Sequence, residues 1–98
     1  MKFVVEVEIP HEPFNTLVRE GTAGQAIGEA LGKIRPEVCY FTDNGVGRGA
    51  FMVVDVDDYT QLPHVTEPLM LAFNASVHYQ IAMSPEDLQN AGLEKYAE

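Results

Sequence analysis

Apolar and polar residues alternate strictly in two stretches of the chain, near its start and over residues 77–83. A period of two predicts β-strands with one apolar face each. Two further stretches, VCYFTD at 38–43 and AFMVVDV at 50–56, also predict strands, the second apolar on both faces as in the middle of a sheet. The alternation places Phe3, Val5, Val7 and Ile9 on one face of the first strand, and Val77, Tyr79, Ile81 and Met83 on one face of the last.

Between the strands the apolar spacing changes to three and four residues, which predicts helices. Residues 13–34 form one such stretch, and Gly21 followed by a Thr22–Gln25 capping box makes two helical pieces the alternative. The stretch after Asp57 and Asp58, one of which is expected to cap it, predicts a short second helix that Pro63 and Pro68 interrupt. The segment SPED at 84–87 predicts the start of a C-terminal helix.

The order of these elements predicts one domain over residues 1–98 of the α+β class. It is the ferredoxin-like βαββαβ pattern with an extra C-terminal helix. Right-handed crossovers and a tight hairpin at Asn44-Gly45 predict an antiparallel sheet with strand order 4-1-3-2. Both long helices then cover one face of the sheet, and the other face is open.

The alternation also predicts which residues occupy the open face. The apolar sets of the first and last strands are expected under the helices, which leaves a mixed surface on the other side. The second strand contributes either Cys39 and Phe41 or Val38 and Tyr40, and its pattern does not choose. The other strands contribute Val4, Glu6, Glu8, Phe51, Val53, Asp55, His78, Gln80 and Ala82.

Charge and cysteine content narrow the classes of partner. Fifteen acidic residues against six basic ones give a formal net charge of −9, which makes nucleic acids and anionic membranes unfavourable partners. Cys39 is the only cysteine, and we expect it to be a small buried residue rather than a reactive one. The sequence has no apolar run long enough to span a bilayer, so we expect a cytoplasmic protein. Asp55, Asp57 and Asp58 lack further oxygen ligands at suitable spacing, so no metal site is predicted, and no cofactor is expected.

The strand patterns resemble those of the dimeric α/β-barrel superfamily of ferredoxin-like proteins. The similarity covers the whole chain and is clearest in KFVVEVEIP, in GAFMVVDVDD and in the last strand leading into AMSPEDL. It is greatest to the small members whose function is not established. The resemblance implies a homodimer in which two open sheets pack face to face around a cavity. The superfamily includes muconolactone isomerase-like enzymes, cofactor-free monooxygenases and haem-handling proteins.

The polar residues of the open face are the candidate site. Glu6 and His78 are expected on adjacent antiparallel strands, where a carboxylate supports a charged imidazole and the pair can transfer a proton. We predict these two as the candidate catalytic residues, and Gln80, Val4, Phe51, Val53 and Asp55 as ligand-binding residues. The favoured function is the binding of a small organic ligand between two sheets. The alternatives are a cofactor-independent isomerase or monooxygenase of small cyclic compounds, and a purely structural dimerisation module.

Overall fold

The computed structural model describes all 98 residues and contains the predicted elements in the predicted order. Its strands are β1 (Lys2–Ile9), β2 (Val38–Asp43), β3 (Arg48–Asp55) and β4 (Ser76–Ala82). Its helices are α1 (His11–Glu20), α2 (Ala23–Ile34), α3 (Pro63–Phe73) and α4 (Pro85–Asn90), with 3-10 helices η1 (Tyr59–Gln61) and η2 (Leu93–Tyr96).

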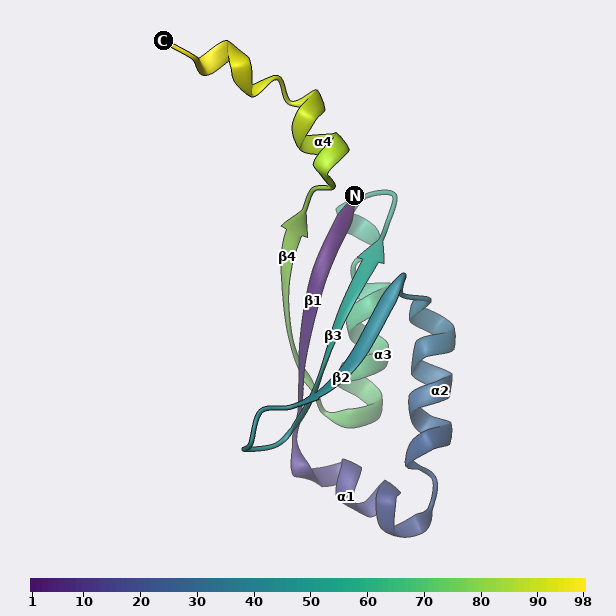
Figure 1. The fold of residues 1–98 in the computed structure, drawn as a ribbon. Helices are drawn as coiled ribbons and strands as arrows, with labels where there is room; N and C mark the ends of the chain where they lie inside the picture. The colour runs from purple at the N-terminus through teal and green to yellow at the C-terminus, as the bar shows by residue number, and fades with distance from the viewer.

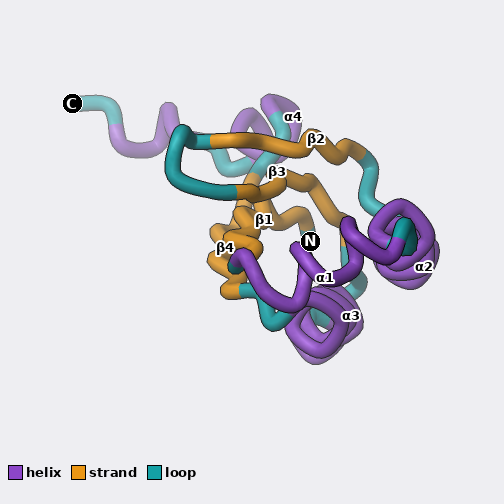
Figure 2. The backbone as a smooth tube through the Cα atoms, turned by 90° about the horizontal axis from the view of Figure 1, so that it is seen from below, coloured by secondary structure: helices purple, strands orange, loops and turns teal.

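The four strands form one antiparallel sheet in the order β2-β3-β1-β4, which confirms the predicted topology. Helices α2 and α3 lie on one side of the sheet, and α1 crosses its lower end (Figure 1). The view along the strands shows a two-layer arrangement in which α1, α2 and α3 all lie on the same side of the sheet (Figure 2). The open face is therefore a real feature of the isolated chain. No helix in the structure is both long and apolar enough to cross a bilayer.

The core lies between the sheet and helices α2 and α3. Strand β1 supplies one buried residue at every second position from Phe3 to Ile9, as its alternation predicts. Helix α3 contributes Val65, Leu69 and Phe73 at four-residue steps, and Phe73 packs against Phe14 of α1 with 5.7 Å between ring centroids. These contacts fix the sheet against its helices and hold the open face in place.

The helical stretch after β1 is divided at Gly21, the alternative that the sequence left open. Gly21 adopts the left-handed conformation with φ +77, and its N–H and that of Thr22 bond back to the carbonyls of Val18 and Leu17. The predicted capping box at Thr22 is wrong, because its hydroxyl donates to the Leu17 carbonyl and caps no N–H of α2. Helix α1 therefore ends in a glycine C-cap and α2 starts separately.

Helix α3 corrects a second expectation. It runs for eleven residues without a break, with Pro63 in its first turn and Pro68 inside it. Pro68 forfeits one backbone hydrogen bond, and the burial of the apolar side chains on the sheet-facing side of α3 offsets that loss. The predicted cap is present one element earlier, where Asp58 accepts the N–H of Thr60 at the start of η1.

Strand β4 is the third correction. Tyr79 and Ile81 lie on the helix side of the sheet as predicted, but they are exposed, Ile81 at 71%, and Met83 just beyond the strand is exposed as well. Helix α3 contacts β4 and Val77 packs against the core, but this cover does not bury the later residues of the edge strand, which Figure 1 shows rising beyond the helix. Alternation thus predicted the direction of these side chains correctly but not their burial.

Candidate site on the open face of the sheet

The strand register arranges the open face in rows that cross all four strands. In one row, two aromatic residues on β2 and β3 lie next to a carboxylate on β1 and an imidazole on β4. In the next row, three valines on β2, β3 and β1 lie next to an amide on β4. The first row is Tyr40, Phe51, Glu6 and His78, and the second is Val38, Val53, Val4 and Gln80.

Tyr40 is the site residue that the sequence did not single out. Its pairing with Phe51 places it on the open face together with Val38, while Cys39 pairs with buried Met52 on the helix side. In VCYFTD both the odd-numbered and the even-numbered positions carry apolar residues. The pattern of this strand therefore does not indicate which set faces the helices. The register across the Asn44-Gly45 hairpin would have supplied one, because fixing which β3 residue faces Tyr40 fixes its side of the sheet.

Glu6 and His78 are direct cross-strand partners, whereas the alternation predicted that Glu6 lies beside either His78 or Gln80 on this face. Their side chains are exposed and form no ion pair in the single chain. Directly opposite residues of an antiparallel pair have Cβ atoms about 4.5–5.5 Å apart, so the carboxylate and the imidazole can meet by rotation about their side-chain bonds alone. Placed together away from water, such a pair can accept and return a proton.

Asp55 occupies the opposite end of the face from the hairpin and is already engaged. Its carboxylate binds the N-terminal ammonium at 3.1 Å and lies 3.6 Å from the ammonium of Lys2. The hydrogen bond from the N-terminal ammonium, assisted by both positive charges, lowers the pKa of Asp55 below its usual 3.8. The Asp55 carboxylate is therefore occupied by its ion pairs at the end of the sheet. The amide of Gln80 and the apolar side chain of Val53 stay available to a ligand.

A hollow of about 210 Å³ opens at the hairpin end of the face, beside Glu6 and Phe51. Gly49 lies in its lining, and a Cβ atom there would come within 2.7 Å of the Val7 carbonyl oxygen. The row that contains Glu8, Thr42 and Gly49 therefore has a gap where every other strand carries a side chain. Glycine is required at this position, and the sequence analysis treated it only as part of the hairpin.

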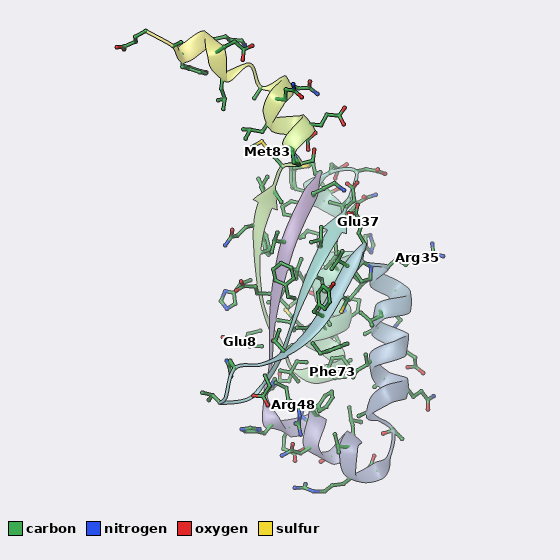
Figure 3. All side chains as sticks on the ribbon, in the orientation of Figure 1. Glu8, Arg35, Glu37, Arg48, Phe73 and Met83 are labelled. Carbon is green, nitrogen blue, oxygen red and sulfur yellow. The ribbon has the colours of Figure 1, made fainter.

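Arg48 lines both this hollow and a larger one of about 520 Å³, whose lining also includes Glu8 and His11. Figure 3 shows Arg48 and Glu8 near the hairpin end of the sheet. Its guanidinium donates to Asn15 Oδ1 at 2.7 Å and lies 4.8 Å from the centre of the Phe14 ring. It has no carboxylate partner within 4.0 Å. These two contacts fix the hairpin to α1, and the pairing of Arg48 with buried Ile9 places its side chain on the helix side of the sheet, at the hairpin end.

The space between the sheet and helices α2 and α3 is much smaller. The apolar gap between the sheet and α2 and α3 measures about 10 Å³, the size of about one water-sized probe. Cys39 lies on this side, half-buried, and burial raises the pKa of its thiol. No group of three or more His, Cys, Asp or Glu side chains is close enough together to hold a metal ion. We therefore take the open face as the candidate site.

The sequence matches no protein-family model and no curated protein, but the fold has solved relatives. One is 5-chloro-2-hydroxyhydroquinone dehydrochlorinase from Burkholderia phenoliruptrix, solved in complex with 2,5-dihydroxybenzoquinone. It is 14% identical, with a TM-score of 0.58 over 88% of this chain and 97% of that one. The chain has the fold of the dimeric α/β-barrel superfamily.

Two further similar structures align less closely. An uncharacterised NIPSNAP domain protein from Burkholderia xenovorans is 13% identical, with a TM-score of 0.44 over 87% of this chain and 97% of that one. MupZ from Pseudomonas fluorescens is 16% identical, with a TM-score of 0.43 over 97% of this chain and 82% of that one. Across such distances a dimeric α/β-barrel fold is shared without a shared activity, and function must be argued from the site.

Proposed function

We propose that this dimeric α/β-barrel chain forms a homodimer, open face against open face, and binds a small cyclic organic ligand between the two sheets. The observation that carries the proposal is the composition of the open face. Apolar side chains occupy its β2 and β3 half, and a carboxylate, an imidazole and an amide occupy its β1 and β4 half. A pocket for a small organic molecule needs this combination of an apolar floor and a few polar groups.

The exposure of the face supports the dimer. Val4, Phe51 and Val53 are only half-buried in the single chain, and Tyr40 is 67% exposed. β1 has eight residues, so the face of four strands measures about 26 by 19 Å, or about 500 Å² in projection for each copy. Two copies give about 1,000 Å², which reaches the lower limit for a specific protein interface.

The chemistry of the face supports a ligand that is flat, apolar and oxygenated. Phe51 and the neighbouring valines offer contact to a ring, while His78, Gln80 and the Tyr40 hydroxyl offer hydrogen bonds to oxygen atoms at its edge. The dehydrochlorinase of the same fold was solved with 2,5-dihydroxybenzoquinone, a ligand of this class. Asp55 contributes at the end of the cavity, where it neutralises the N-terminal ammonium.

The pairing of Glu6 with His78 favours a second function, proton transfer on such a ligand. This is the reaction that a cofactor-independent isomerase needs, and a monooxygenase that activates its own substrate also begins by removing a proton. The two residues stand opposite each other, and Glu6 lies in the lining of the hollow at Gly49. In this function His78 is the base, Glu6 stabilises its charged form, and Gln80 holds the substrate oxygen.

Titration of the protein with 2,5-dihydroxybenzoquinone tests the proposal, with binding followed by calorimetry and by the absorbance of the quinone. We expect binding by the unmodified dimer and a loss of about 1.5–3 kcal/mol, or more than tenfold in Kd, in His78→Ala, because a hydrogen bond to a charged partner is removed. The matched control is His64→Ala, an exposed histidine on α3 that lies off the open face.

The oligomeric mass measured by light scattering completes the experiment. A dimeric His78→Ala variant with weakened quinone binding supports a ligand site on the open face. Equal binding by His78→Ala and His64→Ala removes His78 from the site. A dimer that binds no cyclic oxygenated compound leaves the structural dimerisation module as the function of the face.

A further inference from the structure

The last fifteen residues, Ser84–Glu98, form an arm that projects away from the body of the protein. Figure 1 shows α4 and η2 continuing beyond the end of β4 and reaching no other element, and Figure 3 places Met83 at the junction. Every hydrogen bond of the arm lies within the arm. Its apolar side chains Leu88, Leu93 and Tyr96 are exposed, Tyr96 at 78%.

An arm of this kind is not stable alone in water. Helix α4 has only six residues, although a complete capping box between Ser84 and Asp87 starts it. Isolated helices shorter than about 12–15 residues are marginal even with favourable sequences, because one cap does not offset the cost of nucleation. The defined start and the exposed apolar side chains therefore indicate a segment that is ordered by contact with another surface.

A matching surface exists on the bare helix side of β4. Tyr79 and Ile81 are exposed there, and with Met83, which follows just beyond the strand, they form an apolar strip that we call the edge strip. A hollow of about 410 Å³ lies at the end of this strip, and its lining also includes Lys2, Asp55 and the arm residues Ser84 and Asp87. Five residues of a strand place this strip over about 13 Å. The apolar side chains of the arm lie on two short helical pieces, Leu88 on α4 and Leu93 and Tyr96 on η2, which left-handed Gly92 separates. Each piece is about 8–9 Å long, so each fits within the length of the strip.

We infer that the arm of one copy docks on the edge strip of a second copy, and that two copies exchange arms reciprocally. This inference rests on the proposed homodimer for the presence of the second copy. The contact is isologous: Leu88, Leu93 and Tyr96 of each protomer cover Tyr79, Ile81 and Met83 of the other. Strand β4 ends where the arm begins, so the edge strip and the arm lie at the same end of each protomer (Figure 1).

The size of the sheet interface favours a second copy as the occupant. The open faces alone supply about 1,000 Å² in projection, whereas stable interfaces bury about 1,200–2,000 Å². Exchanged arms add the missing apolar area next to the same interface. The arm carries four carboxylates (Glu86, Asp87, Glu94, Glu98) and one ammonium (Lys95), a net charge of −3, which disfavours an anionic membrane or a nucleic acid as the partner.

Cysteine cross-linking between two differently substituted full-length chains tests the inference. Both chains carry Cys39→Ala; one also carries Leu93→Cys and the other Ile81→Cys. After subunit exchange and mild oxidation we expect a disulfide between unlike chains. Its yield should exceed by at least about tenfold that of the matched pair with Glu94→Cys, because docking raises the effective concentration of two facing thiols to the millimolar range.

The outcomes separate the arm from the sheet dimer. A dimeric mass with no cross-link above the Glu94→Cys control overturns the arm exchange and leaves the proposed function standing. A monomeric mass overturns both. A chain carrying Leu93→Cys and Ile81→Cys together distinguishes a fold-back arm, since an intrachain disulfide formed at high dilution shows that the arm covers its own strand and contradicts the exchange.

Discussion

Truncation of Tyr40 measures how much of the open face is covered in solution. The Tyr40 side chain is 67% exposed in the single chain. A tyrosine offers about 200 Å² of surface, so about 130 Å² remains to be covered, which contributes about 3 kcal/mol per protomer at about 25 cal/mol per Å². If the dimer covers half of this exposed area in each of its two protomers, the two tyrosines together contribute about 3 kcal/mol to the free energy of dimerisation. Tyr40→Ala is therefore expected to raise the dimer Kd roughly a hundredfold.

Sedimentation velocity over a series of protein concentrations measures this Kd. Tyr59→Ala is the matched control, because Tyr59 is 72% exposed but lies on η1, off the sheet. We expect its dimer Kd to equal that of the unmodified chain. Circular dichroism should show both variants folded, since neither tyrosine belongs to the core. Equal Kd values for the two variants would refute the assignment of the open face as the interface.

Three further predictions concern single positions. Gly49→Ala should lower the free energy of unfolding by about 1–3 kcal/mol in urea titrations, because the new Cβ atom would meet a backbone carbonyl of β1. The control Gly32→Ala, whose Cβ atom would have no atom within 4 Å, should raise the free energy of unfolding by up to about 1 kcal/mol. An unchanged free energy of unfolding in Gly49→Ala would contradict the close approach of the two backbones. Asp55→Asn should lower the thermal midpoint near neutral pH. Because the pKa of Asp55 is lowered below 3.8 in the folded state, its contribution is present above that value and is lost as the pH falls through the folded pKa, so the two midpoints should converge in acid; a constant difference would argue against the ion pair. Cys39 should react slowly with a disulfide reagent at neutral pH and faster in urea, since burial raises its pKa above 9.0; equal rates would place it in solvent.

Most of the fold could be predicted from the sequence because its strands are patterned on the scale at which sheets are built. The alternation in β1 and the turn at Asn44-Gly45 identified the strands, and the element order identified the topology. The last helix was equally clear, because the whole capping box is local to SPED. In each case the signal and the structure that it specifies lie within a few residues of each other.

The errors occurred where the outcome depends on distant packing. Alternation gives the direction of Ile81 but not whether a helix reaches it, because the position of α3 is set mainly by its packing against α2. Likewise, no local rule shows that Pro68 is tolerated inside α3. The burial of its neighbours decides that, and burial is a property of the assembled core.

The candidate site was predictable to the same extent. Two clear alternations placed Glu6 beside either His78 or Gln80, and the register pairs it with His78. Tyr40 was missed because β2 is apolar at both parities, and the hollow at Gly49 because it depends on the distance between neighbouring backbones. Whether Glu6, His78, Gln80 and the apolar residues around them bind a ligand stays a prediction.

Contacts between copies at the open face test the central claim most directly. In a dimer assembled from equal parts of isotope-labelled and unlabelled chains, filtered nuclear Overhauser spectra report only contacts between protomers. If two open faces pack together, the methyl groups of Val4, Val38 and Val53 will show contacts to the partner copy. These contacts will include the aromatic rings of Phe51 and Tyr40 on the partner's open face. A dimer whose only such contacts come from the arm or the edge strip, or a chain with none, would contradict the account.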